Sequence, residues 1–195
     1  MKRRFAPVLT LLAACTLCAA SAARITSARQ ATQPTSAASK EVQVHELKKA
    51  KCRFRAPTYW GDIVGGAGDY AVEIDVKGQA DESPCMFMLR CGDKLTGNNL
   101  SDEEKRRVFV ATVRKHAVKD DPEAKLTETR LGGSGATIVL WRTTVTDQKL
   151  RAIHADVCCV RRGVVYQLTF IAPPSRYDEI KGEFQDLVRS FEFTD

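Results

Sequence analysis

The sequence predicts an α+β domain in which an antiparallel sheet is covered by one helix on each face. Four candidate strands follow one another between residues 125 and 172, and connections as short as theirs join antiparallel neighbours. One amphipathic helix is predicted before these strands and another after them. Segments 136–146 and 164–172 are apolar on both faces, so the middle of the sheet needs cover on both sides.

Two further strands are predicted before the first helix. In Tyr70–Val76, apolar residues alternate with polar or small ones, which is the period of a strand with one buried face. Residues 78–84 then have the composition of a turn. Cys85–Cys91 is apolar on both faces, which indicates a central strand.

The first helix is predicted over Asp102–Ala117. Ser101 and Glu104 have the spacing of a capping box, and acidic residues fill the first turn, where they complement the helix dipole. Apolar residues follow at helical spacing. The turn at Asp121-Pro122 then separates this helix from the strands that follow.

A β-meander and a closing helix complete the predicted domain. After Pro173-Pro174, apolar residues from Tyr177 to Phe191 form one stripe of a helix, and Phe191–Phe193 is expected to dock the C-terminus. The four strands of the meander are Lys125–Leu131, Ala136–Thr146, Leu150–Val160 and Val164–Ala172.

The first 22 residues have the pattern of an export signal. A basic start is followed by an apolar run that is too short to span a membrane, and then by small residues. Two cleavage sites overlap. Leu12–Cys15 resembles the bacterial lipobox, which directs lipidation of Cys15, whereas ordinary cleavage near Ala22 would release a soluble periplasmic or secreted protein. Residues 23–40 are predicted to be a flexible linker, and residues 41–195 a single domain.

The basic residues of the leader and linker account for the formal net charge of +6. All 24 acidic residues lie from Glu41 onward, and so do 24 of the 30 lysines and arginines. The predicted domain is therefore formally neutral. A nucleic-acid-binding domain would carry its positive charge within the fold, so no nucleic-acid partner is predicted.

The sequence resembles the PsbP-like superfamily. The resemblance rests on "CRFRAPTYW", on the glycine run Leu131–Gly135, on "GVVYQLTFIAPPSRYDEI" and on "FQDLVRSFEF". The superfamily includes the extrinsic PsbP protein of photosystem II, envelope proteins of the DcrB type and a Ran-binding nuclear import factor. The resemblance implies an α/β/α sandwich around an antiparallel sheet of about six or seven strands. It transfers no catalytic residues, and known members mostly bind or assemble other proteins.

Five cysteines remain once the leader is removed, in a compartment that permits disulfides. We expect one or two disulfides that link the N-terminal segment or the Cys85 strand to the Cys158-Cys159 strand, with an odd thiol left free. The alternative is that all five are reduced core residues, because cysteine packs well as a small hydrophobe. The candidates are Cys52, Cys85, Cys91, Cys158 and Cys159.

The function predicted from these observations is that of a non-catalytic binding or assembly module of the cell envelope, anchored by a lipid. Its partner would be a protein or a small ligand, and no cofactor or metal is expected. Two loops, 60–69 and 92–99, are candidate contact surfaces, with Tyr59 and Trp60 as possible contact residues. One alternative is a purely structural lipoprotein. Another is a thiol-dependent enzyme that uses Cys158 or Cys91, which would need an exposed thiolate of low pKa.

Overall fold

The computed structural model describes residues 41–66, 69–74, 85–94, 99–145 and 150–194. The predicted leader and linker, with Cys15 and Ala22, lie outside these residues. The larger sheet is antiparallel, has seven strands, and follows the order β3-β4-β5-β9-β8-β7-β6. Its strands are β3 (Val64–Gly66), β4 (Asp69–Ile74), β5 (Cys85–Lys94), β6 (Lys125–Leu131), β7 (Ser134–Val145), β8 (Leu150–Arg161) and β9 (Val164–Ala172).

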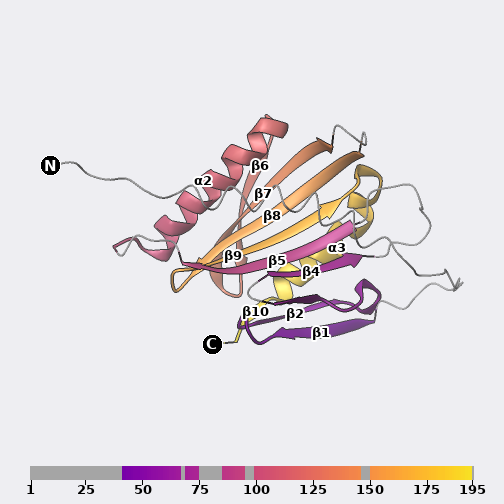
Figure 1. The fold of residues 1–195 in the computed structure, drawn as a ribbon, viewed down its shortest axis with the longest axis horizontal. Coiled ribbons are helices and arrows are strands. Elements are labelled where there is room, and N and C mark those ends of the chain that lie inside the picture. Colours follow the sequence, from indigo (N-terminus) through magenta and orange to yellow (C-terminus); the bar gives the residue numbers. More distant parts are fainter. Residues whose placement is uncertain (1–40, 67–68, 75–84, 95–98, 146–149, 195) are drawn as a thin grey trace, which may run out of the picture. The chain divides into compact units, whose positions relative to one another are not determined.

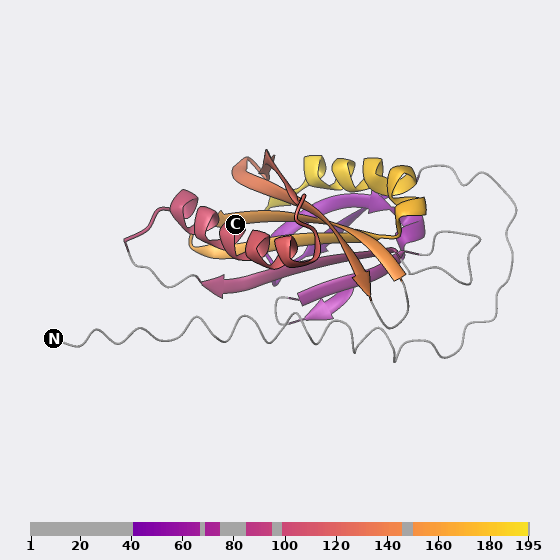
Figure 2. The same ribbon diagram turned by 90° about the horizontal axis from the view of Figure 1, so that it is seen from above.

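A second, three-stranded antiparallel sheet has the order β1-β2-β10. Its strands are β1 (Val42–Leu47), β2 (Cys52–Pro57) and β10 (Glu192–Phe193), so it joins the two ends of the domain. The two helices are α2 (Asp102–Asp120) and α3 (Pro174–Ser190). They lie on opposite faces of the seven-stranded sheet (Figures 1 and 2).

The two faces of the large sheet bury two separate apolar clusters. Beneath α2, Phe109 and Val110 pack with Val139, Trp141 and other residues of β7, β8 and β9. The larger cluster, on the other face, is shared by α3 and the small sheet. It is rich in aromatic side chains, among them Phe54, Trp60, Phe87, Phe170 and Phe184.

Both ends of α2 are fixed to the sheet by carboxylates. The Asp102 carboxylate accepts the backbone N–H groups of Arg162 at 2.6 Å and Gly163 at 2.8 Å, in the turn between β8 and β9. At the other end, Asp121 accepts the N–H of Arg142 at 2.9 Å. The predicted capping box is present as well, since Ser101 and Glu104 bond reciprocally. These contacts hold α2 in a fixed position over β7 and β8.

The predicted α+β fold, with its meander and two main helices, is confirmed. All six predicted strands and both helices are present, and their bounds differ from the predicted ones by a few residues. Helix α2 extends to Asp120 and α3 begins at Pro174, where the fixed φ of proline suits the first helical position. The three-stranded sheet was not predicted. As a result, α3 shares the cover of its face with β2.

Candidate functional site

A groove with a volume of about 840 Å³ runs between α2 and the edge strand β6. We call it the α2–β6 groove. Its volume falls in the range of binding clefts, about 300–1,000 Å³. It is lined on α2 by Glu103, Arg106, Arg107, Val110, Ala111, Arg114, Lys115 and Val118, on β6 by Leu126 and Glu128, and on β7 by Thr137.

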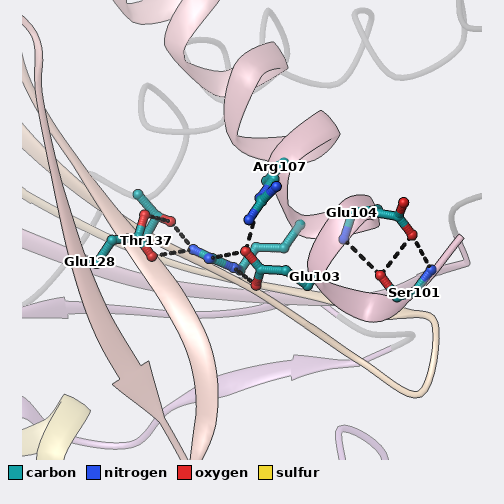
Figure 3. Close-up of polar contacts among 7 residues, drawn as sticks. Ser101, Glu103, Glu104, Arg107, Glu128 and Thr137 are labelled. Atoms are coloured by element: carbon teal, nitrogen blue, oxygen red, sulfur yellow. Dashed lines mark hydrogen bonds and ion pairs between the residues drawn. The ribbon is translucent and has the colours of Figure 1, made fainter.

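A buried arginine closes one end of the groove. Arg106 is only 7% exposed and binds Glu103 through two parallel bonds, from Nη2 at 2.7 Å and from Nε at 3.0 Å. Its Nη1 donates to Glu128 at 2.7 Å and also to Thr137. The Thr137 hydroxyl in turn donates to Glu128 at 2.9 Å. Figure 3 marks these contacts, which tie the first turns of α2 to β6 and β7.

The network shifts the pKa values of Glu103 and Arg106. Hydrogen bonds from Arg106, with a smaller contribution from Arg107, hold the pKa of Glu103 below its ordinary value. The same hydrogen bond to Glu103, together with those to Glu128, raises the pKa of Arg106. Arg106 pairs with both Glu103 and Glu128, and Arg107 adds a second positive charge beside Glu103.

Beyond this network the groove is basic and partly apolar. Arg114 and Lys115 are exposed on α2, and neither makes a hydrogen bond or ion pair within the described ranges. Val110, Val118 and Leu126 are apolar residues of the lining, and of these Leu126 is exposed, whereas Val110 is buried. Four basic and two acidic residues line the groove, although the domain as a whole is formally neutral. The groove therefore offers apolar contact and uncompensated positive charge together.

The structure places the two predicted contact residues differently. Trp60 is 1% exposed and packs among Phe87 and Phe170, so it cannot contact a partner, and the expectation for this residue was wrong. Tyr59 is 41% exposed. Both side chains donate hydrogen bonds to Glu183 of α3, the indole at 3.1 Å. The pair thus fastens the end of β2 to α3.

The two candidate loops are described only in part. In the first, residues 60–66 and Asp69 are described, and β3 and the first residue of β4 occupy four of its positions. In the second, residues 92–94 belong to β5. The positions 67–68 and 95–98 lie outside the described residues.

All five candidate cysteines are buried thiols, and the expected disulfides are not formed. Strand order gives the reason. Strand β9 lies between β5 and β8, so Cys85 and Cys91 are two strand spacings, about 9.5 Å, away from Cys158 and Cys159. A disulfide requires Cα atoms within about 7 Å of each other. The thiols pack as small apolar side chains instead.

Burial also opposes the thiol chemistry that an enzyme would need. It raises the pKa of Cys91 and raises that of Cys158 well above its ordinary value, where nearby Asp156 adds to the effect. A nucleophilic cysteine requires the opposite, an exposed thiolate of lowered pKa.

His154, Asp156 and Cys158 lie at alternate positions of β8 and so share its α2 face. The carboxylate of Asp156 is a buried hydrogen-bond acceptor on this face. Asp156 accepts hydrogen bonds from Trp141 at 2.7 Å, Thr169 at 2.6 Å and Gln167 at 3.0 Å. His154 stacks on Trp141 with ring centroids 4.1 Å apart. Burial lowers the pKa of His154 despite the neighbouring carboxylate of Asp156, so the ring is neutral at neutral pH.

No group of three or more His, Cys, Asp or Glu side chains in the described part of the chain is arranged to hold a metal ion. In the same part of the chain, no helix is both long and apolar enough to cross a membrane.

Sequence reasoning did not find the α2–β6 groove. Its lining residues come from three segments, and neither Arg114 nor Leu126 belongs to a motif. Arg106 is one of several basic residues in the predicted helix, and it was not singled out from the sequence. The available signal was its spacing from Glu103, because an i,i+3 acid on a helix can pair with an arginine.

Comparisons with known proteins support the fold. No protein-family model matches the sequence, and no curated protein is similar to it in sequence. Among solved structures, the Ran-binding protein Mog1p of Saccharomyces cerevisiae is similar with a TM-score of 0.53 and 12% identity, over 80% of this chain and 97% of that one. This likeness shows a Mog1-like fold, which the resemblance to the PsbP-like superfamily implied.

Two further solved structures are similar at lower scores. The cyanobacterial PsbP of Synechocystis has a TM-score of 0.43 and 15% identity, over 83% of this chain and 98% of that one. LpqN of Mycobacterium tuberculosis, described as involved in cell envelope biogenesis, has a TM-score of 0.39 and 12% identity, over 79% of each chain.

Proposed function

We propose that this protein is a non-catalytic binding module of the cell envelope, held at the membrane by a lipid on Cys15, and that it receives a protein partner in the α2–β6 groove. The observation that carries the binding role is the groove itself, where Arg114 and Lys115 have no ion-pair partner among the described residues and Leu126 is exposed on β6. Unpaired charge next to apolar surface is typical of a recognition site on a rigid scaffold. The envelope location rests on the leader sequence.

Site-directed photo-crosslinking in the native host tests the binding role. A photoreactive residue at Arg114 would sit in the groove, whereas one at Thr112 would sit on the same helix, also exposed, about 160° around its axis. We expect a discrete adduct from position 114 and none from position 112. No adduct from position 114, or the same adducts from both positions, would contradict the proposed function.

The lipid anchor is tested separately by intact mass. Protein from the membrane fraction should begin at Cys15 and carry a lipid adduct. A mass that begins near Ala22 without a lipid would show that the protein is exported in soluble form. This result would leave the role of the groove untouched.

The alternative of a thiol-dependent enzyme makes a different prediction. Such an enzyme would react with iodoacetamide rapidly and stoichiometrically at neutral pH, through one thiolate. We expect the native protein to label slowly at all five domain cysteines, because each of them is buried.

A further inference from the structure

Strand β6 is an edge of the seven-stranded sheet, and within the described ranges no strand pairs with its outer side. An edge strand offers a row of backbone N–H and C=O groups to any extended chain that lies alongside. The α2–β6 groove opens along this strand, since Leu126 and Glu128 of β6 line it.

The turn between β6 and β7 determines which backbone groups point outward. Gly132 and Gly133 form a two-residue connection with φ angles of +52° and +82°, and Leu131 pairs with Ser134. Residues that flank a two-residue hairpin turn form a hydrogen-bonded pair, and such pairs alternate along the ladder. The backbone groups of Leu126, Glu128 and Arg130 therefore face away from β7.

Strand β6 has one of the usual protections of an edge, charged side chains, but not the others. Natural edges are blunted by charged side chains, by proline, by bulges or by very short strands. Lys125, Glu128 and Arg130 are the charged residues of β6. Here all seven residues pair with β7 in an unbroken register, and none of them is proline. By contrast, β3 at the other edge of the same sheet has only three residues, two of which are glycine. The longer of the two edges, with an unbroken register, is thus on the groove side of this sheet.

The charge of the side chains around this edge determines which kind of segment could bind beside β6. A strand added beside β6 would direct alternate side chains toward α2, where Arg114 and Lys115 lie. The two groove carboxylates pair with Arg106 and Arg107, which together offset their charge, so the free charge that meets the added strand is positive. Acidic side chains at alternate positions would complement this charge, and their methylene groups would cover Leu126.

We infer that β6 takes up an extended acidic segment of a partner protein as an additional strand of the sheet, with alternate carboxylates directed toward Arg114 and Lys115. This inference rests on the proposed function and gives the chemistry of its partner. In recognition by strand addition, main-chain hydrogen bonds supply affinity and alternate side chains supply specificity. A second copy of this chain fits less well, because pairing of two β6 strands would bring two basic helix walls together.

The test uses the mature protein and blocked, fluorescein-labelled peptides. The reference peptide is Val-Glu-Thr-Glu-Thr-Glu-Val, which alternates acidic and neutral residues. One derivative is N-methylated at its three glutamates, and the other at its two threonines and second valine. A peptide strand that pairs with β6 uses only the backbone N–H groups on one of its own sides, and these belong to every second residue. Only one of the two methylation patterns removes them. Fluorescence anisotropy should therefore show one derivative weakened by about tenfold or more and the other changed by less than about threefold.

Two protein variants test the other side of the same contact. Leu126→Pro removes an N–H that faces outward, and Leu126→Ala removes the same side chain but keeps that N–H. Only the proline variant should lose about tenfold in affinity, provided that its circular dichroism spectrum is unchanged. If it does not fold, the methylated peptides still decide the question. Arg114→Glu should weaken all peptides that bind.

The outcomes separate strand addition from the proposed function. Binding that depends on Arg114 but is indifferent to both methylation patterns would identify a general polyanion site, for a nucleic acid or an acidic surface, and would overturn strand addition. Failure of the reference peptide to bind would also overturn it. In either case a crosslink from position 114 in cells would still support the groove as the binding surface.

Discussion

Replacing Arg106 with methionine tests how much the buried network of the groove contributes to stability. The expected loss in free energy of unfolding lies between two limits. Removal of one partner from a fully buried ion pair costs about 3–5 kcal/mol, because it strands an unpaired charge. Loss of an exposed pair costs about 0–1 kcal/mol. Arg106 is itself buried, so the surroundings of its partners decide between the two limits.

The partners lie mostly in solvent. The side chains of Glu103 and Glu128 are 45% and 70% exposed, so water hydrates both carboxylates once the guanidinium is gone. Thr137 is buried but still has Glu128 as an acceptor. Methionine fills the space of the aliphatic stem. The variant therefore loses the net contribution of the charge-assisted hydrogen bonds to the free energy of unfolding, about 1–2 kcal/mol. This loss would lower Tm by roughly 3–6 °C in a domain of this size.

Guanidinium denaturation followed by circular dichroism measures this loss. Arg107→Met is the matched control, because its side chain is 74% exposed and contacts only Glu103, and it should cost less than about 0.5 kcal/mol. A loss above about 4 kcal/mol for Arg106→Met would refute the reasoning, since it would mean that the carboxylates are not hydrated in the variant. A loss equal to that of the control would show that the network contributes nothing.

The remaining predictions concern pH and packing. The pKa of Glu103 is lower in the folded state than its ordinary value of 4.5, so ionised Glu103 stabilises the fold fully above that value and progressively less as the pH falls through the folded pKa. The difference in free energy of unfolding between wild type and Arg106→Met should therefore shrink below about pH 4. Denaturation at a series of pH values measures this difference. Asp156→Ala leaves buried donors without an acceptor and should cost about 3 kcal/mol or more, whereas a cost under about 1 kcal/mol would contradict its packing role. Trp60→Ala should cost about 3–5 kcal/mol by the same assay, and Tyr59→Phe less than about 1.5 kcal/mol; comparable losses would be inconsistent with their different burial.

The strands of the large sheet could be predicted because their periodicity reflects burial directly. Val164–Ala172 was predicted with the bounds that it has, since both its faces are covered. The small sheet was missed for a physical reason. In β1, Val42 and Val44 are exposed, so these two apolar residues mark its solvent side, and only Leu47 at its end marks the core side. In β2 the alternation of Cys52, Phe54 and Ala56 with arginines was a usable signal.

The groove could not be predicted because it depends on the distance between elements. Whether Arg114 and Leu126 line one cleft is set by the position of α2 over β7 and β8, which leaves β6 beyond the edge of the helix. The sequence alone gives neither this offset nor the free side of β6. Trp60 illustrates the same limit, since the glycines that follow it suggested an exposed loop whereas its indole lies among core aromatics.

The Arg106 network also has a consequence for binding that is separate from its effect on stability. Glu103 and Glu128 line the groove, and without the guanidinium they would repel an acidic segment. Arg106→Met should therefore weaken the acidic reference peptide even where the domain remains folded, and Glu128→Gln added to that variant should restore part of the affinity. Restoration by a neutral amide is not expected if Arg106 acts only by holding the fold together. If the double variant binds no better than Arg106→Met alone, charge compensation is not the role of this arginine in the groove.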